Sequence, residues 1–119
     1  MNAPKAIAAN YIALWNETDL SRRARALEER WESDASYIDP VMQGSGRQAI
    51  DALIAGVHAR FPGFSFKLID EPNGHANFVR FSWSLGPAGG EAPIEGSDVL
   101  VMKGGRIGEV IGFLDKVPQ

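Results

Sequence analysis

The stretch IDALIAGVHARFPGFSFKLI, residues 50–69, decides the fold because its hydrophobic period changes halfway along. Before Pro62, apolar residues recur every three or four positions, as on one face of a helix. They are Ile50, Leu53, Ile54, Val57 and Phe61. After Gly63, apolar and polar residues alternate through Phe64, Phe66 and Leu68, as in a half-buried strand. Pro62-Gly63 ends the helix, so the chain changes there from helices to strands.

Two more helices are predicted upstream. Ile7, Tyr11, Leu14 and Trp15 share one face of a helix that begins near Pro4 and ends near Asn16. A second helix follows Asp19, its predicted N-cap. Its apolar stripe consists of Leu20, Ala24, Leu27 and Trp31, and its charged residues, Arg23 among them, are expected to form a solvated face. A brief extended stretch then leads to the third helix, with Ser45 as the predicted cap.

Four strands are predicted downstream, at about 64–69, 76–85, 94–102 and 107–114. Gly104-Gly105 favours a two-residue hairpin, and consecutive strands are expected to pair antiparallel. In the last strand, the alternation does not decide which set of side chains faces inward. The predicted fold is a single α+β domain spanning residues 1–119, a cone-shaped α+β barrel with three N-terminal helices packed on a curved, mostly antiparallel sheet.

Composition excludes several classes of protein. A net charge of −3 over 119 residues argues against nucleic acid as a partner. The chain has no cysteine and two histidines, so we expect no metal site and no thiol chemistry. No apolar run approaches the roughly 20 residues that cross a bilayer, and the start lacks the order of a signal peptide. We therefore expect a cytoplasmic protein without a membrane partner.

Asp98 is the first candidate for chemistry. It is in phase with Gly96, Leu100 and Met102, so an inward face would place its carboxyl group among apolar side chains. Burial would raise its pKa, and a neutral carboxylic acid can donate a hydrogen bond to an oxyanion. The alternative is that Asp98 pairs with Arg80 or lies on the outer face of the sheet.

Asp39 and Tyr11 are further candidates. Asp39 precedes a proline that fixes the backbone, as suits a firmly held general base. The simpler explanation is an Asp-Pro turn whose side chain bonds local backbone amides. Tyr11 belongs to an apolar helical stripe and is either a core residue or an oxyanion donor. His58 and His75 are interpreted as helix-end and turn residues. The aromatic residues are expected to wall a pocket as well as fill the core.

The chain resembles the nuclear transport factor two-like superfamily, in its SnoaL-like and ketosteroid-isomerase-like branch. The resemblance rests on ANYIALWNETD, WESDASYIDP, GSGRQAIDALI, FPGFSF, HANFVRFSW, GSDVLVMKGGRI and VIGFLD, in that order. It implies a phenol at Tyr11 and a protonated acid at Asp98 that donate to an oxyanion, with Asp39 as the proton-shuttling base. Beside these catalytic residues, the predicted ligand pocket consists of Trp15, Phe61, Phe66, Phe81, Trp83, Met102 and Phe113.

Two functions are compatible with this pattern. The first is a cofactor-free isomerase, cyclase or dehydratase that transfers a proton on a small apolar carbonyl compound. The second is a non-catalytic module that binds a ligand or a partner with the same fold. Phe78, Arg80, Ser82 and Ser84 are predicted on the outer face of the sheet, where they suit a homodimer.

Overall fold

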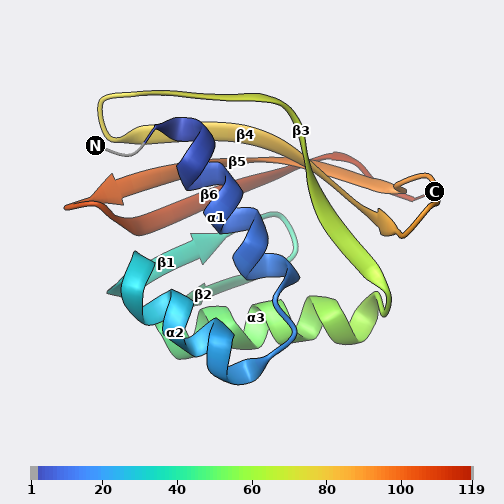
Figure 1. Ribbon diagram of the computed structural model, residues 1–119, viewed down its shortest axis with the longest axis horizontal. Coiled ribbons are helices and arrows are strands. Elements are labelled where there is room, and N and C mark those ends of the chain that lie inside the picture. Colours follow the sequence, from blue (N-terminus) through green and yellow to red (C-terminus); the bar gives the residue numbers. More distant parts are fainter. Residues whose placement is uncertain (1–2, 119) are drawn as a thin grey trace.

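The computed structural model describes residues 3–118 as three helices on one curved six-stranded sheet. In chain order the elements are α1 (Pro4–Asn16), α2 (Leu20–Arg30), β1 (Trp31–Ile38), β2 (Gln43–Ser45), α3 (Arg47–Arg60), β3 (Phe64–His75), β4 (Phe78–Pro87), β5 (Ile94–Lys103) and β6 (Arg106–Lys116). Figure 1 shows α1 crossing in front of the sheet, while α2 and α3 lie along its lower side. The predicted α+β class, with three helices on a curved sheet, is confirmed.

The sheet has the strand order β2-β1-β6-β5-β4-β3. Every neighbouring pair is antiparallel except β1 with β6, which is parallel. The edge strands β2 and β3 do not pair with each other, so the cone is not closed. The four predicted strands are β3 to β6, and the stretch predicted as extended contains β1 and β2. This open, curved sheet leaves a concave face for the helices to cover.

Local signals explain most of the element boundaries. The Asp19 side chain accepts from the Arg22 backbone N–H at 3.0 Å, which confirms Asp19 as the N-cap of α2. Gly104 and Gly105 have φ values of 59° and 84°, as a tight hairpin between β5 and β6 requires. The predicted cap of α3 is wrong: Ser45 ends β2, and Gly46, with φ 89°, occupies the N-cap.

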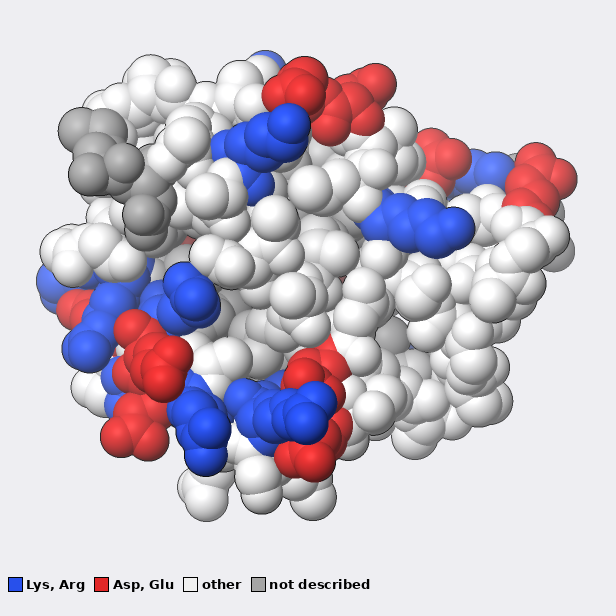
Figure 2. Space-filling view, in the orientation of Figure 1, with Lys and Arg blue, Asp and Glu red and all other residues white. Residues whose placement is uncertain are grey.

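The charged face of α2 differs from the prediction at one residue. Figure 2 shows many Lys, Arg, Asp and Glu side chains gathered over α2, at the lower left. Arg23, however, is only 3% exposed, and its Nε lies 2.7 Å from Asp51 Oδ1 on α3. Leu20, predicted on the apolar stripe, is 66% exposed. The helix is therefore rotated so that an arginine, rather than Leu20, faces α3, and the buried charge is compensated by Asp51.

The end of α1 is fixed between β3 and α3 by side chains. Asn16 exchanges two hydrogen bonds with the Phe66 backbone: its Nδ2 donates to Phe66 O at 2.9 Å, and its Oδ1 accepts from Phe66 N at 2.7 Å. His58 Nε2 on α3 lies 2.7 Å from the Trp15 carbonyl oxygen. These contacts hold the aromatic face of α1 at a set distance from the sheet and from α3.

A bulge resolves the ambiguous phase of the last strand. The β5–β6 register shifts between Val101 and Met102, which pair with Glu109 and Ile107. Because β6 has one extra residue there, Ile107 and Val110 are both buried although their spacing is odd. Beyond the bulge Gly112 is also buried. No helix among residues 3–118 is long and apolar enough to cross a membrane.

Candidate functional site

A cavity of about 520 Å³ lies between α1, α3 and the concave face of the sheet. Its walls are mainly apolar. Of the residues predicted to line a pocket, Trp15, Phe61, Phe66 and Trp83 line it. Other apolar lining residues are Ile12, Val41, Met42, Leu53, Val57, Leu85, Ile94, Leu114, Val117 and Pro118. The cavity is therefore shaped to exclude water from most of a small ligand.

Three predicted pocket residues do not line this cavity. Phe81 is buried behind it, with its ring 5.1 Å from the ring of Tyr11. Met102 lines a smaller hollow of about 250 Å³ on the other side of α1. Phe113 is 53% exposed on the outer face, because the β6 bulge sets Gly112 and Leu114 inward instead. Tyr11 contributes to both hollows.

The polar groups of the cavity gather at one place. Tyr11 from α1, Tyr37 from β1, Asp39 just after β1, and Asp98 from β5 all line it. The structure therefore brings together the three predicted catalytic residues and adds Tyr37. Arg60, at the end of α3, is the other charged side chain in the described lining. Among residues 3–118, no three His, Asp or Glu side chains come together as a metal site.

Asp98 lies on the inward face of β5 and is only 2% exposed. Its Oδ1 has no hydrogen-bond partner among the described residues. Burial raises the pKa of Asp98 to about 6, and the nearby Tyr11 hydroxyl and Trp83 indole partly offset this rise. Arg80, the alternative partner, is exposed and lies on the opposite face of β4. The carboxyl group thus has no basic partner among the described residues, and the polar groups beside it are the Tyr11 hydroxyl and the Trp83 indole.

Gly112 makes room for both carboxyl groups. It is the register partner of Asp98 on β6. A Cβ at Gly112 would lie 2.8 Å from Asp98 Oδ1 and 3.1 Å from Asp39 Cβ. Any larger residue would therefore press on both acidic residues, and glycine is the residue that fits between them.

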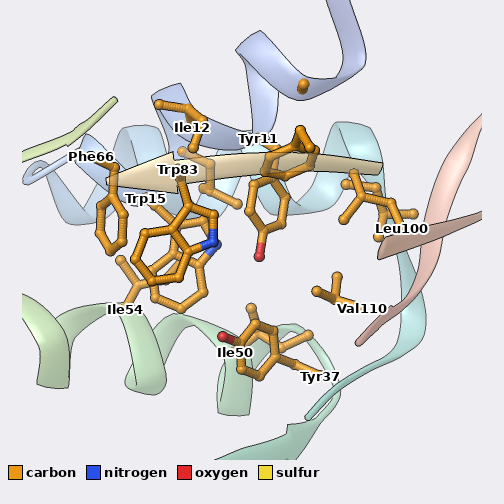
Figure 3. Packing of buried hydrophobic residues seen from close by; sticks show 14 of the residues in the cluster. Tyr11, Ile12, Trp15, Tyr37, Ile50, Ile54, Phe66, Trp83, Leu100 and Val110 are labelled. Atoms are coloured by element: carbon orange, nitrogen blue, oxygen red, sulfur yellow. The ribbon is translucent and has the colours of Figure 1, made fainter. Parts of the chain in front are cut away.

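Tyr11 presents a buried hydroxyl that has no hydrogen-bond partner in the part of the chain that the structure describes. Its ring packs on Trp31 at 5.9 Å and on Phe81, which fixes its direction. Figure 3 shows the hydroxyl directed away from α1 into the interior, beside Trp15 and Trp83. Burial, followed by the charge of Asp98, raises the pKa of Tyr11 well above its usual value. The hydroxyl therefore keeps its proton and is available as a donor.

Asp39 is held by three hydrogen bonds. Its Oδ1 accepts from the backbone N–H groups of Val41 and Met42 at 2.8 and 2.9 Å. Its Oδ2 accepts from the Tyr37 hydroxyl at 2.6 Å. The local turn expected as the simpler explanation is thus present, and the same turn fixes the carboxylate at the edge of the cavity.

Comparison with known proteins places this arrangement in a family. A model of the SnoaL-like domain matches residues 8–110. The chain belongs to the SnoaL-like domain family. A SnoaL-like protein from Agrobacterium tumefaciens, provisionally named an isomerase, is 44% identical, with 92% of this chain and 95% of that one covered and a TM-score of 0.89. No match was found among curated proteins.

More distant relatives of this SnoaL-like chain share the fold alone. A protein from Kribbella flavida, provisionally named a ketosteroid isomerase, is 18% identical over 98% of this chain and 80% of that one, with a TM-score of 0.72. A protein from Sinorhizobium meliloti, provisionally named a polyketide cyclase, is 16% identical over 90% and 93%, with a TM-score of 0.71. The resemblance recognised from the sequence is confirmed at the level of family and fold.

Sequence reasoning missed Tyr37 and Gly112 beside the acidic residues of the SnoaL-like site, and Arg60 in the wall of the same cavity. Tyr37 is two positions before Asp39, and residues two apart in an extended chain point the same way, so the spacing contained this signal. Gly112 gave no signal on its own, because its role depends on the register of β5 with β6. His58 and His75 stay outside the polar cluster; His58 contacts Trp15 O, and His75 packs beside Phe78.

Proposed function

We propose that this protein is a cofactor-independent enzyme that transfers a proton within a small apolar carbonyl compound. The observation that carries this proposal is the Tyr11 hydroxyl and Asp98 Oδ1, which lie beside the fixed carboxylate of Asp39. With Trp15 Nε1, they are the three buried side-chain polar atoms that have no hydrogen-bond partner among residues 3–118. Buried polar atoms without partners are rare in proteins and need a reason. In the proposed function, an oxygen atom of the ligand is the missing hydrogen-bond partner at this end of the cavity.

In the proposed reaction, Asp39 accepts the proton from the carbon next to the carbonyl group. The electron pair of that C–H bond forms the enolate, whose negative oxygen accepts hydrogen bonds from Tyr11 and from protonated Asp98. The proton then returns from Asp39 to the same or another carbon, so no oxidant or reductant is needed. With a pKa of about 6, Asp98 is about one-tenth protonated at pH 7, and an apolar ligand favours that neutral form further.

Deuterium exchange tests this reaction without knowledge of the natural substrate. A panel of small cyclic ketones is incubated with the protein in D₂O, and loss of the proton next to the carbonyl group is followed by NMR. We expect faster exchange with the wild-type protein, and loss of that acceleration in Asp39→Asn. Asp34→Asn, at an exposed position on β1, is the matched control and should keep full activity.

The result also distinguishes the competing function. If the protein binds the ketones but neither the wild type nor the Asp34→Asn control accelerates exchange, the non-catalytic binding module is favoured. Acceleration that persists in Asp39→Asn would remove Asp39 as the base. Acceleration that depends on Asp39 supports the enzyme.

We also propose that the protein forms a homodimer through the outer face of the sheet. Large apolar side chains are exposed on this face: Ile38 is 47% exposed, Phe78 40% and Phe113 53%. Ile38 is the register partner of Ile111, which precedes Phe113 by two residues on the same side of β6. Sedimentation of the wild type and of Phe113→Lys tests this: a dimer that becomes a monomer supports the proposal, and a wild-type monomer overturns it.

A further inference from the structure

We infer that the cavity accepts amphipathic anions, with an apolar body inside and a negatively charged group held by Arg60. The carbonyl group at the other end of the ligand rests on the proposed function. The site for the negatively charged group does not, because it depends on the face of α3 that forms one wall of the cavity. The substrate class is thereby narrowed to carbonyl compounds that carry an acidic group.

Arg60 is placed at the cavity by the helical repeat of α3. The helix lines the cavity with Ala52, Leu53, Gly56, Val57 and Arg60, and Phe61 follows directly. These residues form one face of α3, and the guanidinium group of Arg60 lies at its C-terminal end. Within residues 3–118, no other Lys or Arg lines the cavity, and Arg60 forms no ion pair there. A single unpaired cation thus lies at one end of an apolar chamber.

Aromatic rings restrain this cation. The guanidinium carbon of Arg60 lies 5.8 Å from the centroid of the Phe61 ring, within the range of a cation–π contact. The Phe61 ring in turn stacks on Phe64 at 5.3 Å. Arg60 is exposed, and because Phe61 itself lines the cavity, this contact places the guanidinium group at the cavity wall, where a ligand can reach it.

The charges of the cavity define an orientation for such a ligand. Asp39 and Asp98 lie together beside Gly112, so the electrostatic potential there disfavours an anion. Arg60 instead lies at the end of α3 beside Phe61, whose ring stacks on the edge strand β3, whereas Asp98 is on β5, two strands away from that edge. A negatively charged group therefore binds best at Arg60, and the uncharged carbonyl end reaches the acidic residues.

Arg60 could instead serve only to stabilise α3, and the experiment must distinguish this role from ligand binding. Arg60 and His58 both lie in the last turn of α3, where a cation stabilises the helix through its dipole. That role would make the charge important for stability without any preference among ligands. The discriminating measurement is therefore a comparison of two ligands that differ only in charge.

Two fluorescent probes provide this comparison. 1-Anilinonaphthalene-8-sulfonate carries a sulfonate, whereas N-phenyl-1-naphthylamine has the same rings without it. We expect Arg60→Gln to weaken binding of the sulfonate probe by roughly three- to fivefold, the size of one exposed ion pair. Binding of the neutral probe should not change. Arg60→Lys should keep most of the affinity for the sulfonate, and Arg25→Gln, which removes an exposed charge of α2, should bind both probes as the wild type does.

A blocking variant locates the probes. Gly56 lines the cavity, and a Cβ there would meet nothing within 4 Å, so Gly56→Trp introduces a ring without a backbone clash. We expect it to weaken both probes. Equal affinity of the wild type and Arg60→Gln for the sulfonate probe would overturn the inference, and so would an equal loss of affinity for both probes in Arg60→Gln. Unchanged affinity of Gly56→Trp for the two probes would show that they bind outside the cavity, and would overturn it too. None of these outcomes depends on the exchange reaction, whose loss in Asp39→Asn tests the proposed function separately.

Discussion

Asp98 on β5 and Gly112 on β6 are register partners on adjacent strands, and they lie so close that a Cβ at Gly112 would be 2.8 Å from Asp98 Oδ1. Asp98 owes its position in the cavity to this missing side chain. The same missing side chain brings Asp39 near, since the added Cβ would also lie 3.1 Å from Asp39 Cβ. The two carboxyl groups are thus brought together by a position that has no chemistry of its own.

Gly112→Ala should therefore disturb both acidic residues. The added methyl group forces Asp98 to move within a packed interior, which costs about 1–3 kcal/mol of unfolding free energy. We expect the rate of ketone exchange to fall as well, because the methyl group displaces both acidic residues. Gly108→Ala, on the same strand, is the control, because its Cβ would come no closer than 3.3 Å to Lys103 Cβ. Urea unfolding and exchange rates that are equal for the two variants would contradict the role of Gly112.

The buried Asp98 should make stability depend on pH in an unusual direction. Because its pKa is raised from 3.8 to about 6 in the folded state, the folded state holds the proton more tightly than the unfolded state. Its contribution to stability is complete below about pH 3.8 and is lost as the pH rises through about 6. Most paired carboxylates act in the opposite direction, as Asp19 does, whose pKa is lowered chiefly by its bond from the Arg22 backbone.

Asp98→Asn removes this dependence. Between pH 4.5 and pH 7, the unfolding free energy of the variant should rise relative to the wild type by about 2 kcal/mol. Urea unfolding of both proteins at the two pH values measures this difference, and all other titrating groups cancel in the comparison. A difference that stays constant with pH would show that Asp98 titrates as a solvated carboxyl group does.

Tyr37→Phe tests how Asp39 is held. The variant loses the 2.6 Å bond to Asp39 Oδ2 but keeps the ring in its buried place. We expect the rate of ketone exchange to fall by roughly tenfold, since a loosely oriented base reacts less often. The unfolding free energy should change by about 1 kcal/mol. An unchanged exchange rate would show that the bonds from Val41 and Met42 are enough to orient Asp39.

Asn16→Ala should destabilise the fold. It removes both bonds to the Phe66 backbone and leaves the Phe66 N–H and C=O groups unpaired, at a cost of about 1–3 kcal/mol. Asn16→Asp keeps the acceptor for Phe66 N, but it places a carboxylate oxygen where the amide donor faced Phe66 O, so we expect it to be destabilised as well. Thermal unfolding should rank the wild type above both variants.

Gly56→Ala should stabilise the protein. Gly56 lies within α3, its surroundings are open, and glycine inside a helix costs about 1 kcal/mol relative to alanine. The melting temperature should rise accordingly, with no loss of binding by the two naphthalene probes. A lower melting temperature would contradict the open surroundings of Gly56.

The parts of the fold that could be predicted are those with an undisturbed period. In β4, Val79, Phe81, Trp83 and Leu85 alternate without interruption, and all four are buried as predicted. In β6 the bulge changes the phase between Ile107 and Val110, so period two alone misplaced Phe113. The parallel pairing of β1 with β6 joins segments about seventy residues apart, and nothing local in the chain reports such a contact.

The site shows the same division. Asp98 could be placed inward because β5 alternates regularly from Ile94 to Leu100. Arg23 could not be separated from its neighbours in a run of charged residues, because its burial depends on Asp51 in another helix. The turn at Asp39 follows from its proline, whereas its hydrogen bond from Tyr37 depends on which side chains the pleat of β1 directs into the cavity.

The ring of Tyr11 stands between two hollows, one of about 520 Å³ and one of about 250 Å³, and contributes to the lining of both. Within residues 3–118, Tyr11 is the residue that the two linings have in common. Its side chain therefore shapes both spaces at once, and a shorter residue at position 11 would enlarge both of them at the expense of the buried phenol.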